Sequence, residues 1–461
     1  MIPLGGGDYF VLALDHLMRR MGLEGNICRL AVQVLQPLDR DRFASALRRS
    51  TLIGWLSSLR LSARLPFFPP IWVAHGSKAR PIVRDHVDSR PGSLSEALSS
   101  IASARRSRTA PSPHLAFDLV DHLDGSSSII LTWHHALMDA LGAELLLSHL
   151  NGCADIDPVC VPACACTHAD RQRTGRRIDE NLPALIQPHS GQSVPRYLLR
   201  FPRNFLSTRR AVLFITKTSR FPIASLVGSS IGVIRPCNRY RFVSFDESKT
   251  VEVDAHADRI GASFHRGLFY LASTIRAFDR VRATRGLNGD AYVIPIPQDR
   301  RKRGASGPIL SNRITFQFYR VEPQQTGLLT DTYETLKQQM VDQMRADIPG
   351  SYNTLMELFR NVPLGWYARV LRGPTKGQLS TFFYSYTGEV GAGMDHFLGA
   401  PVKALRHLPP VAQPPGVAVV FSRHRNRLHA TLTYLEGCLS DAEVALFEET
   451  LRFQLLVGDK S

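Results

Sequence analysis

The sequence predicts an α/β (α+β) protein made of two similar lobes, and three observations lead to this fold class. The chain has 461 residues, which is too long for one small core and is typical of two or three domains. Short apolar, β-branched runs alternate with segments of helical periodicity along both halves of the chain. The second half repeats the mixture of the first without a short-period repeat, which disfavours a solenoid or a propeller.

The pattern predicts an N-terminal lobe at residues 1–160, an inter-lobe crossover at 161–240 and a C-terminal lobe at 241–461. In the first lobe we expect helices at Asp15–Met21, Arg42–Arg49 and Ser93–Ala102, and strands at Ile27–Leu35, Leu115–Leu119 and Ser128–Trp133. In the second we expect strands at Phe242–Phe245, Ala291–Ile296, Ile314–Val321, Leu379–Tyr386, Val417–Phe421 and Leu428–Tyr434, with helices at Ser248–Ile260, Ser263–Arg282, Thr330–Arg345 and Asp441–Leu456.

The crossover has the weakest pattern of the chain. Its segment Arg196–Arg210 mixes basic and apolar residues, and a surface-lying amphipathic piece is one interpretation, which would allow a peripheral membrane contact. No apolar run approaches the ~18 residues of a membrane span, and Met1–Phe10 does not resemble a signal peptide. We therefore expect a cytoplasmic protein, with membrane-peripheral association left open, and a monomer.

The chain carries a net charge of +16, from 56 Lys and Arg against 40 Asp and Glu. This excess favours phosphate-bearing or acidic partners such as coenzyme A, an acidic carrier protein or anionic lipid. The arginines are scattered, and no aromatic-interleaved basic motif is present, so we expect no nucleic-acid partner.

Four of the seven cysteines gather at Cys153, Cys160, Cys164 and Cys166, with His168 and two aspartates nearby. Their spacings do not match a pair of CxxC motifs, so a loop with incidental thiols is favoured over a zinc site. We predict no metal and no cofactor, and metal analysis would test the zinc alternative.

One local pattern could carry chemistry, the run His134-His135-Ala136-Leu137-Met138-Asp139 between a predicted strand and a predicted helix. A histidine is neutral near physiological pH and can remove a proton from an acceptor. Asp139 would lie at the helix N-terminus, where it could cap the helix or pair with a distant arginine. Adjacent histidines alone are more often structural or metal-binding than catalytic.

In this context the sequence resembles the condensation-domain and chloramphenicol-acetyltransferase-like acyltransferase superfamily. The signature of that superfamily is two histidines, three variable residues, an aspartate and a glycine between a strand and a helix. Weaker similarities follow in the family's order at Leu38–Leu47, Ile260–Ala272, Pro295–Arg301, Ser311-Asn312, Tyr384–Gly388 and Arg423–Leu435. The resemblance implies that the two lobes, each a mixed, mostly antiparallel sheet flanked by helices, form a V with a tunnel at their interface.

The resemblance also implies a role for each matching residue. His135 would be the general base, with His134 facing the interior, and Asp139 would be structural, paired with Arg301 or, as the second choice, Arg300. Asn312 and Ser385 would line the channel, and Ser385 or Thr387 could hold the oxyanion. For Asn312 and Ser385, ordinary turn or strand-edge hydrogen bonding is an equally open interpretation.

Two positions depart from the family pattern. Ala140 replaces the glycine after the aspartate, and its methyl group could narrow the channel. Ser311 replaces the glycine before Asn312. Neither change removes an acid or a base.

The sequence therefore predicts an acyltransferase that moves an acyl group from a coenzyme A or carrier-protein thioester to a hydroxyl or amine. The donor, as acyl-coenzyme A or acyl-pantetheine, would be a substrate and not a bound cofactor. The alternative is a non-catalytic condensation-like domain that docks carrier proteins. The absence of a fused carrier or adenylation segment favours a stand-alone enzyme of lipid or secondary metabolism.

Overall fold

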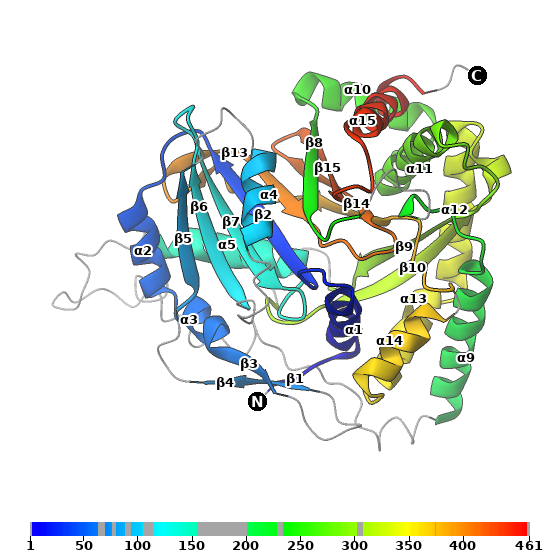
Figure 1. Cartoon of the computed structure of the whole chain (residues 1–461), viewed down its shortest axis with the longest axis horizontal. Coiled ribbons are helices and arrows are strands. Elements are labelled where there is room, and N and C mark those ends of the chain that lie inside the picture. Colours follow the sequence, from blue (N-terminus) through cyan, green and yellow to red (C-terminus); the bar gives the residue numbers. More distant parts are fainter. Residues whose placement is uncertain are drawn as a thin grey trace.

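The computed structural model describes residues 2–458 apart from 63–69, 76–79, 88–93, 105–113, 155–200, 228–233, 302–307 and 374. Figure 1 shows two halves side by side, with strands β2, β5, β6 and β7 in one and β8, β14 and β15 in the other. The first helix, α1 (Gly6–Arg20), lies below the junction of the two halves. None of the helices within the described ranges is long and apolar enough to cross a bilayer.

The N-terminal half is built on a six-stranded sheet that is antiparallel except for its last pair. In spatial order its strands are β12 (His396–Phe397), β13 (Ala400–Leu408), β2 (Ile27–Val34), β7 (Ser127–His134), β6 (Leu115–Asp121) and β5 (Ile82–Val87). Its helices are α2 (Arg40–Arg49), α3 (Thr51–Ser58), α4 (Leu94–Ala104) and α5 (Ala140–Ala154). A small sheet of β1 (Ile2–Pro3), β4 (Ile71–Ala74) and β3 (Leu59–Ser62) adjoins them.

The central strands of this sheet read as continuous apolar runs because both of their faces are covered. Every residue of β7 is buried, and so is all of β2 except Gln33. The turn at Asp124-Gly125 joins β6 to β7 as predicted, and Gly125 has a φ of 78°, which a glycine adopts without strain.

The C-terminal half is built on a four-stranded sheet and an adjoining hairpin. The sheet order is β11 (Phe383–Glu389), β14 (Val417–His424), β15 (Arg427–Leu435) and β8 (Asn238–Ser244), and the hairpin pairs β9 (Tyr292–Asp299) with β10 (Ile314–Val321). The helices are α10 (Glu247–Arg259), α11 (Arg266–Thr284), α12 (Leu329–Arg345) and α15 (Asp441–Leu456), with a short 3-10 turn at Pro323–Gln325.

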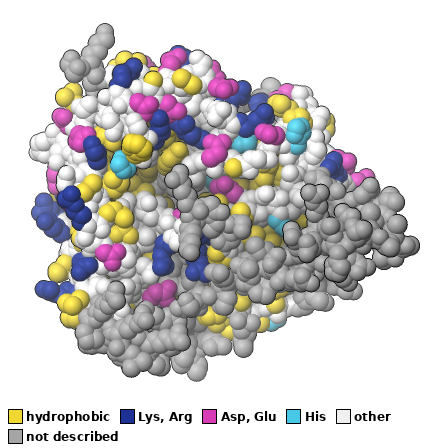
Figure 2. All heavy atoms as spheres, turned by 180° about the vertical axis from the view of Figure 1, so that it is seen from behind, with side chains coloured by type: hydrophobic (Ala, Val, Ile, Leu, Met, Phe, Trp, Pro, Cys, Tyr) yellow, Lys and Arg dark blue, Asp and Glu magenta, His cyan; other side chains and the backbone are white. Residues whose placement is uncertain are grey.

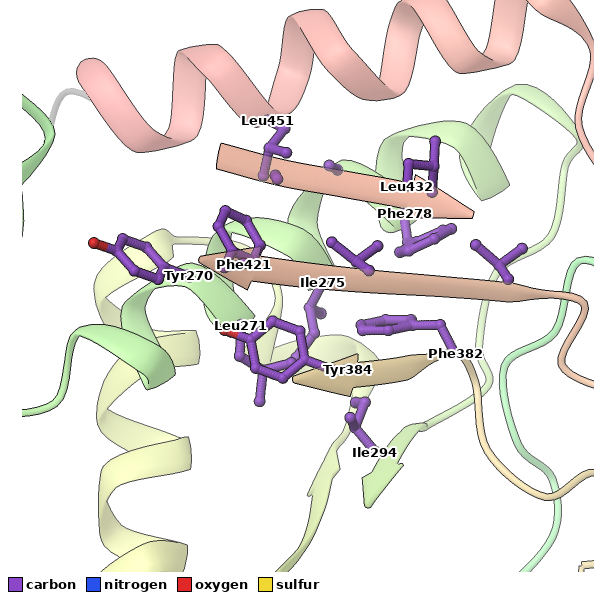
Figure 3. Packing of buried hydrophobic residues seen from close by; sticks show 14 of the residues in the cluster. Tyr270, Leu271, Ile275, Phe278, Ile294, Phe382, Tyr384, Phe421, Leu432 and Leu451 are labelled. Atoms are coloured by element: carbon purple, nitrogen blue, oxygen red, sulfur yellow. The ribbon is translucent and has the colours of Figure 1, made fainter. Parts of the chain in front are cut away.

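The core of this half is rich in stacked aromatic rings. Phe278 of α11 stacks on Phe382, with ring centroids 4.6 Å apart, and Tyr270 stacks on Phe421 at 5.0 Å. Figure 3 shows these rings between the strands and the helices, with Leu451 of α15 closing the cluster. Such offset contacts add to the free energy of burial and fix the side chains in one arrangement.

Three further helices pack near α1: α9 (Phe201–Thr218), α13 (Ile348–Phe359) and α14 (Leu364–Arg372). Helix α13 lies between α1 and α9 and covers β10 with apolar side chains such as Tyr352 and Met356. These helices therefore enclose space beside the hairpin instead of covering the two large sheets.

The structure confirms the two-lobed mixed architecture and the strands and helices predicted for each lobe, with ends that shift by a few residues except at α1, which starts at Gly6 and not at Asp15. One segment of the predicted C-terminal range, 396–408, crosses over and completes the N-terminal sheet by pairing β13 with β2. The predicted crossover lies mostly outside the described residues, and its described part contains helix α9.

Candidate active site

The loop after β7 holds the histidine pair at the junction of the two halves. His134 is the last residue of the strand, and the side chain of Trp133 donates from Nε1 to the carbonyl of Met138 at 2.8 Å, which closes the loop. Helix α5 then starts at Ala140. The motif is therefore a strand, a tight loop and a helix, as the sequence predicts.

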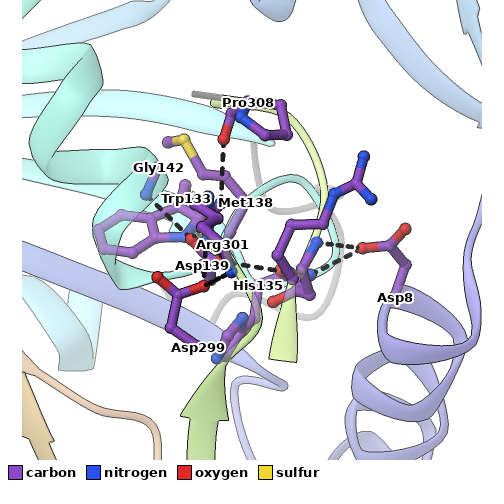
Figure 4. A network of polar contacts seen from close by, with 11 residues as sticks. Asp8, Trp133, His135, Met138, Asp139, Gly142, Asp299, Arg301 and Pro308 are labelled. Carbon is purple, nitrogen blue, oxygen red and sulfur yellow. Dashed lines mark hydrogen bonds and ion pairs between the residues drawn. The ribbon is translucent and has the colours of Figure 1, made fainter. Parts of the chain in front are cut away.

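The backbone of His135 is held at both ends by other segments. Its N–H donates to the carbonyl of Asn26 at 2.9 Å, and its carbonyl accepts from Nδ2 of Asn312 at 2.8 Å. Asn312 is in turn fixed by Asp8 of α1, whose Oδ1 accepts from both the backbone and the side-chain nitrogen of Asn312. Figure 4 shows this chain of contacts from α1 to the histidine. The ring is thus presented from a backbone that other segments hold in place.

The ring of His135 is half-buried and lines a cavity of about 520 Å³. Burial lowers the pKa of His135, while the neighbouring Asp139 and Asn312 act in the opposite direction and do not overcome it. The neutral ring is therefore favoured at pH 7. Among the described residues, the buried Nδ1 atom of the ring has no hydrogen-bond partner.

Asp139 both caps helix α5 and forms an ion pair. Its Oδ1 accepts from the N–H of Gly142 at 2.9 Å, and its two oxygens accept from the guanidinium of Arg301 at 2.8 and 3.0 Å. Burial lowers the pKa of Arg301, but the Asp139 carboxylate outweighs it and raises the pKa above the usual value. The pair joins α5 of one half to the end of β9 in the other (Figure 4).

His134 faces the interior, as predicted. Its Nε2 lies 3.3 Å from Oδ1 of Asp15, which also accepts from the backbone N–H of Asn26. Burial by itself would raise the pKa of Asp15, but His134 and Arg19 lower it to about 2. His134 therefore orients the loop from α1 and does not reach the cavity lining.

Comparison with known proteins finds likeness in structure only. No sequence-family model matches the chain, and no curated protein sequence is recognisably similar to it. Among solved structures, the trichothecene 15-O-acetyltransferase from Fusarium sporotrichioides superposes with a TM-score of 0.65 at 12% identity, covering 99% of this chain and 95% of that one. The first condensation domain of the CDA synthetase gives a TM-score of 0.64 at 15% identity, covering 99% and 97%. This chain has the condensation-domain fold. The condensation domain of the Monacolin K polyketide synthase has the same architecture, with a TM-score of 0.60 at 11% identity over 99% and 96%.

In this condensation-domain fold the cavity lies between the halves and takes its lining from both. Ser385 and Thr387 of β11 line it, as do Ala140 and Asp139 of the motif loop. Thr387 donates its hydroxyl to the carbonyl of Phe421 at 3.2 Å, so that proton is already engaged.

The prediction for Asn312 needs correction. Asn312 is buried behind the histidine and is not part of the cavity lining. Its side-chain amide donates to Asp8 and to the carbonyl of His135.

Arg300 does not take part in the ion pair that Arg301 forms with Asp139. Its side chain is exposed, and its Nη1 donates to Asn353 at 2.5 Å. The alternative pairing of Arg300 with Asp139 is therefore wrong.

Ser311, which precedes Asn312, has a strained backbone. Its φ is 82°, in the left-handed region, and its hydroxyl is buried with no hydrogen-bond partner among the described residues. The position is fixed because its N–H donates to the carbonyl of Leu137 at 2.8 Å. A serine here costs about 1–2 kcal/mol relative to glycine.

We therefore expect Ser311→Gly to stabilise the protein by about 1 kcal/mol, after allowing for the greater freedom of glycine in the unfolded chain. Thermal unfolding should show a rise of about 1 °C in the midpoint. Ser273→Gly is the matched control, because Ser273 lies inside α11 and glycine there lowers stability by a similar amount. A fall in the midpoint of Ser311→Gly would contradict the assigned strain.

Most of the cysteine cluster lies outside the described residues. Cys160, Cys164, Cys166 and His168 belong to the undescribed range, and Cys153 is a buried thiol 3.5 Å from His149. In the part of the chain that is described, no group of three or more His, Cys, Asp or Glu side chains could hold a metal.

The sequence reasoning missed the contribution of α1 to the site. Asp8 and Asp15 are buried and lie seven residues apart, on one face of a helix whose predicted start was Asp15. Two acidic residues on an otherwise apolar helical face were the signal that could have identified them, because buried carboxylates need partners.

Proposed function

We propose that this protein transfers an acyl group from a coenzyme A or carrier-protein thioester to a hydroxyl or amine, with His135 as the general base. The observation that carries this proposal is the ring of His135. Its backbone is held at both ends by other segments, burial lowers its pKa, and its ring lines a cavity between the halves.

The reaction needs one proton acceptor. Nε2 of His135 would take the proton of the acceptor hydroxyl or amine as the acceptor oxygen or nitrogen bonds to the thioester carbonyl carbon. The carbonyl oxygen then carries the negative charge, for which Ser385 is the candidate donor. When the carbon–sulfur bond breaks, the leaving thiolate would recover the proton from His135 and depart as a thiol.

The relatives in structure support acyl transfer as a class. One is named as an O-acetyltransferase and several as condensation domains. Others are named as an epimerization domain and an X-domain, so the fold is compatible with other roles. The complete His135 and Asp139 set favours acyl transfer over a domain that only docks carrier proteins.

The first experiment is a thiol-release assay with the full chain. Acyl-coenzyme A and acyl-carrier-protein donors of several chain lengths are mixed with alcohols and amines, and free thiol is measured. Acceptor-dependent release is expected with one donor class. If every donor is inert while the folded protein still binds a carrier protein, the docking alternative replaces acyl transfer.

The pH dependence follows from the lowered pKa of His135. The base works only when unprotonated, so kcat/KM should be full above this pKa and fall as the pH drops through it. Because the pKa is lowered, the acid limb should lie below the ordinary histidine value of about 6.5. A profile of kcat/KM against pH on a donor that does not titrate in this range tests this. An acid limb above pH 7 would contradict a neutral, buried base.

A further inference from the structure

The cavity has an opening between helices α9 and α14. Val212 of α9 and Val370 of α14 both line the cavity, and both are also nearly half exposed to solvent. The segments that follow the two helices meet, since Lys376 lies over the ring of Phe221 at 4.6 Å. The two helices therefore border one mouth.

The surface around this mouth is unusually apolar. Helix α9 packs against α13 through Ala211 and its neighbours, while Leu206 and Leu213, on the opposite face, are 59% and 56% exposed. On α14, Trp366 is 65% exposed and lies one turn from Val370. We call Leu206, Val212, Leu213, Trp366 and Val370 the mouth rim. Adjacent large apolar residues in water mark a binding surface.

The charges on the same two helices are all positive. Neither α9 nor α14 contains an aspartate or a glutamate. Their exposed cationic residues are Arg209, Arg210, Lys217, Arg369 and Arg372. Figure 2, which views the molecule from behind, shows dark-blue basic and yellow apolar side chains next to each other along its left edge. The matching partner is therefore both apolar and anionic.

We propose that the mouth rim docks on an anionic lipid bilayer, so that a lipid-soluble substrate passes from the bilayer into the cavity. A helix with leucines flanked by arginine and lysine, beside an exposed tryptophan, is suited to a membrane interface. Docking does not depend on catalysis, whereas substrate entry rests on the acyl transfer proposed above.

The cavity behind the rim suits an apolar chain better than a polar arm. Beyond Val212 and Val370 its walls include Phe10 and Leu14 of α1, Phe316 of β10, and Leu355 and Phe359 of α13. A carrier-protein pantetheine contains amides that would need hydrogen-bond partners along such walls. A hydrocarbon chain needs none, which is why lipid is favoured over an acidic carrier protein as the occupant of this rim.

The test is co-flotation of the full chain with vesicles of phosphatidylcholine, with and without phosphatidylglycerol. We expect binding to the anionic vesicles that weakens with added salt. The double variant L206E/L213E should bind at least tenfold more weakly, because it removes apolar contact and adds two repelled charges. These two leucines do not line the cavity, so thiol release from a short-chain, water-soluble donor should be unchanged.

The matched control is V251E/V457E, which makes the same charge change at two exposed apolar residues outside the rim. It should keep wild-type vesicle binding and the same thermal midpoint as the rim variant. No binding of wild type to anionic vesicles, or equal loss in both double variants, overturns the proposal. Carrier-protein binding lost only in L206E/L213E would instead assign the rim to a protein. If the wild type binds vesicles but releases no thiol from any donor, the docking proposal stands and the acyl-transfer proposal fails.

Discussion

The variant His135→Ala should lose about 10²–10⁴-fold in kcat/KM for acyl transfer, the usual contribution of a positioned general base. The loss should appear mainly in kcat, because Nε2 would accept the proton only as the reaction proceeds, while the cavity walls that bind the substrate are unchanged. Acceptor-dependent thiol release, with wild type and variant at equal concentration, measures it. His135→Ala should also remove the acid limb of the pH profile.

Thr387→Ala is the matched control for this result, since Thr387 lines the same cavity. The hydroxyl of Thr387 already donates to the carbonyl of Phe421, so we expect Thr387→Ala to change kcat less than tenfold. Removal of an oxyanion donor typically lowers kcat by about 10²–10³-fold. The thermal midpoints of both variants should stay near wild type. A His135→Ala protein with more than a tenth of wild-type activity would remove the histidine from the mechanism.

The variant Arg301→Ala should lower the free energy of unfolding by about 3–5 kcal/mol, because it leaves the buried carboxylate of Asp139 without its cation. The side chains of Arg301 and Asp139 are only 3% and 7% exposed, so water cannot replace the lost contact easily. Chemical denaturation followed by intrinsic fluorescence measures the change. Activity should fall as well, because Asp139 shapes the loop that carries His135.

The neighbouring Arg300→Ala is a close control, since it removes the same side chain one residue away. Arg300 is exposed and bonds Asn353, so the expected change is within about 0.5 kcal/mol. Equal effects of the two substitutions would mean that the Asp139–Arg301 pair contributes little to the fold.

The sequence predicted the features that depend on local pattern. The strand that ends at His134, the helix that begins after Asp139 and strand β10 all follow from periodicity and capping. The Asp139–Arg301 pair came from the resemblance, and the structure confirms it. Function itself stays a proposal, because similarity in fold leaves the substrates open.

The features that were missed depend on contacts between distant segments. The pairing of β13 with β2 joins segments that lie far apart in the sequence, and no local pattern in either segment indicates its partner. Asn312 was placed in the channel because its sequence context resembles the family, whereas its actual position is set by Asp8 of α1. Helix α13 begins with Ile348-Pro349, and α14 directly follows Pro363; prolines at such positions read as turns in sequence.

The same β13–β2 pairing has a consequence for how the protein is made. During synthesis, β2 emerges early and β7 can pair with one of its edges, but its other edge stays open until residues 400–408 leave the ribosome. An open apolar strand edge is a template for pairing with other chains. The N-terminal sheet therefore cannot be completed before residues 400–408 have been translated. For most of the synthesis of the chain, the open edge of β2 has to be kept from pairing with other chains.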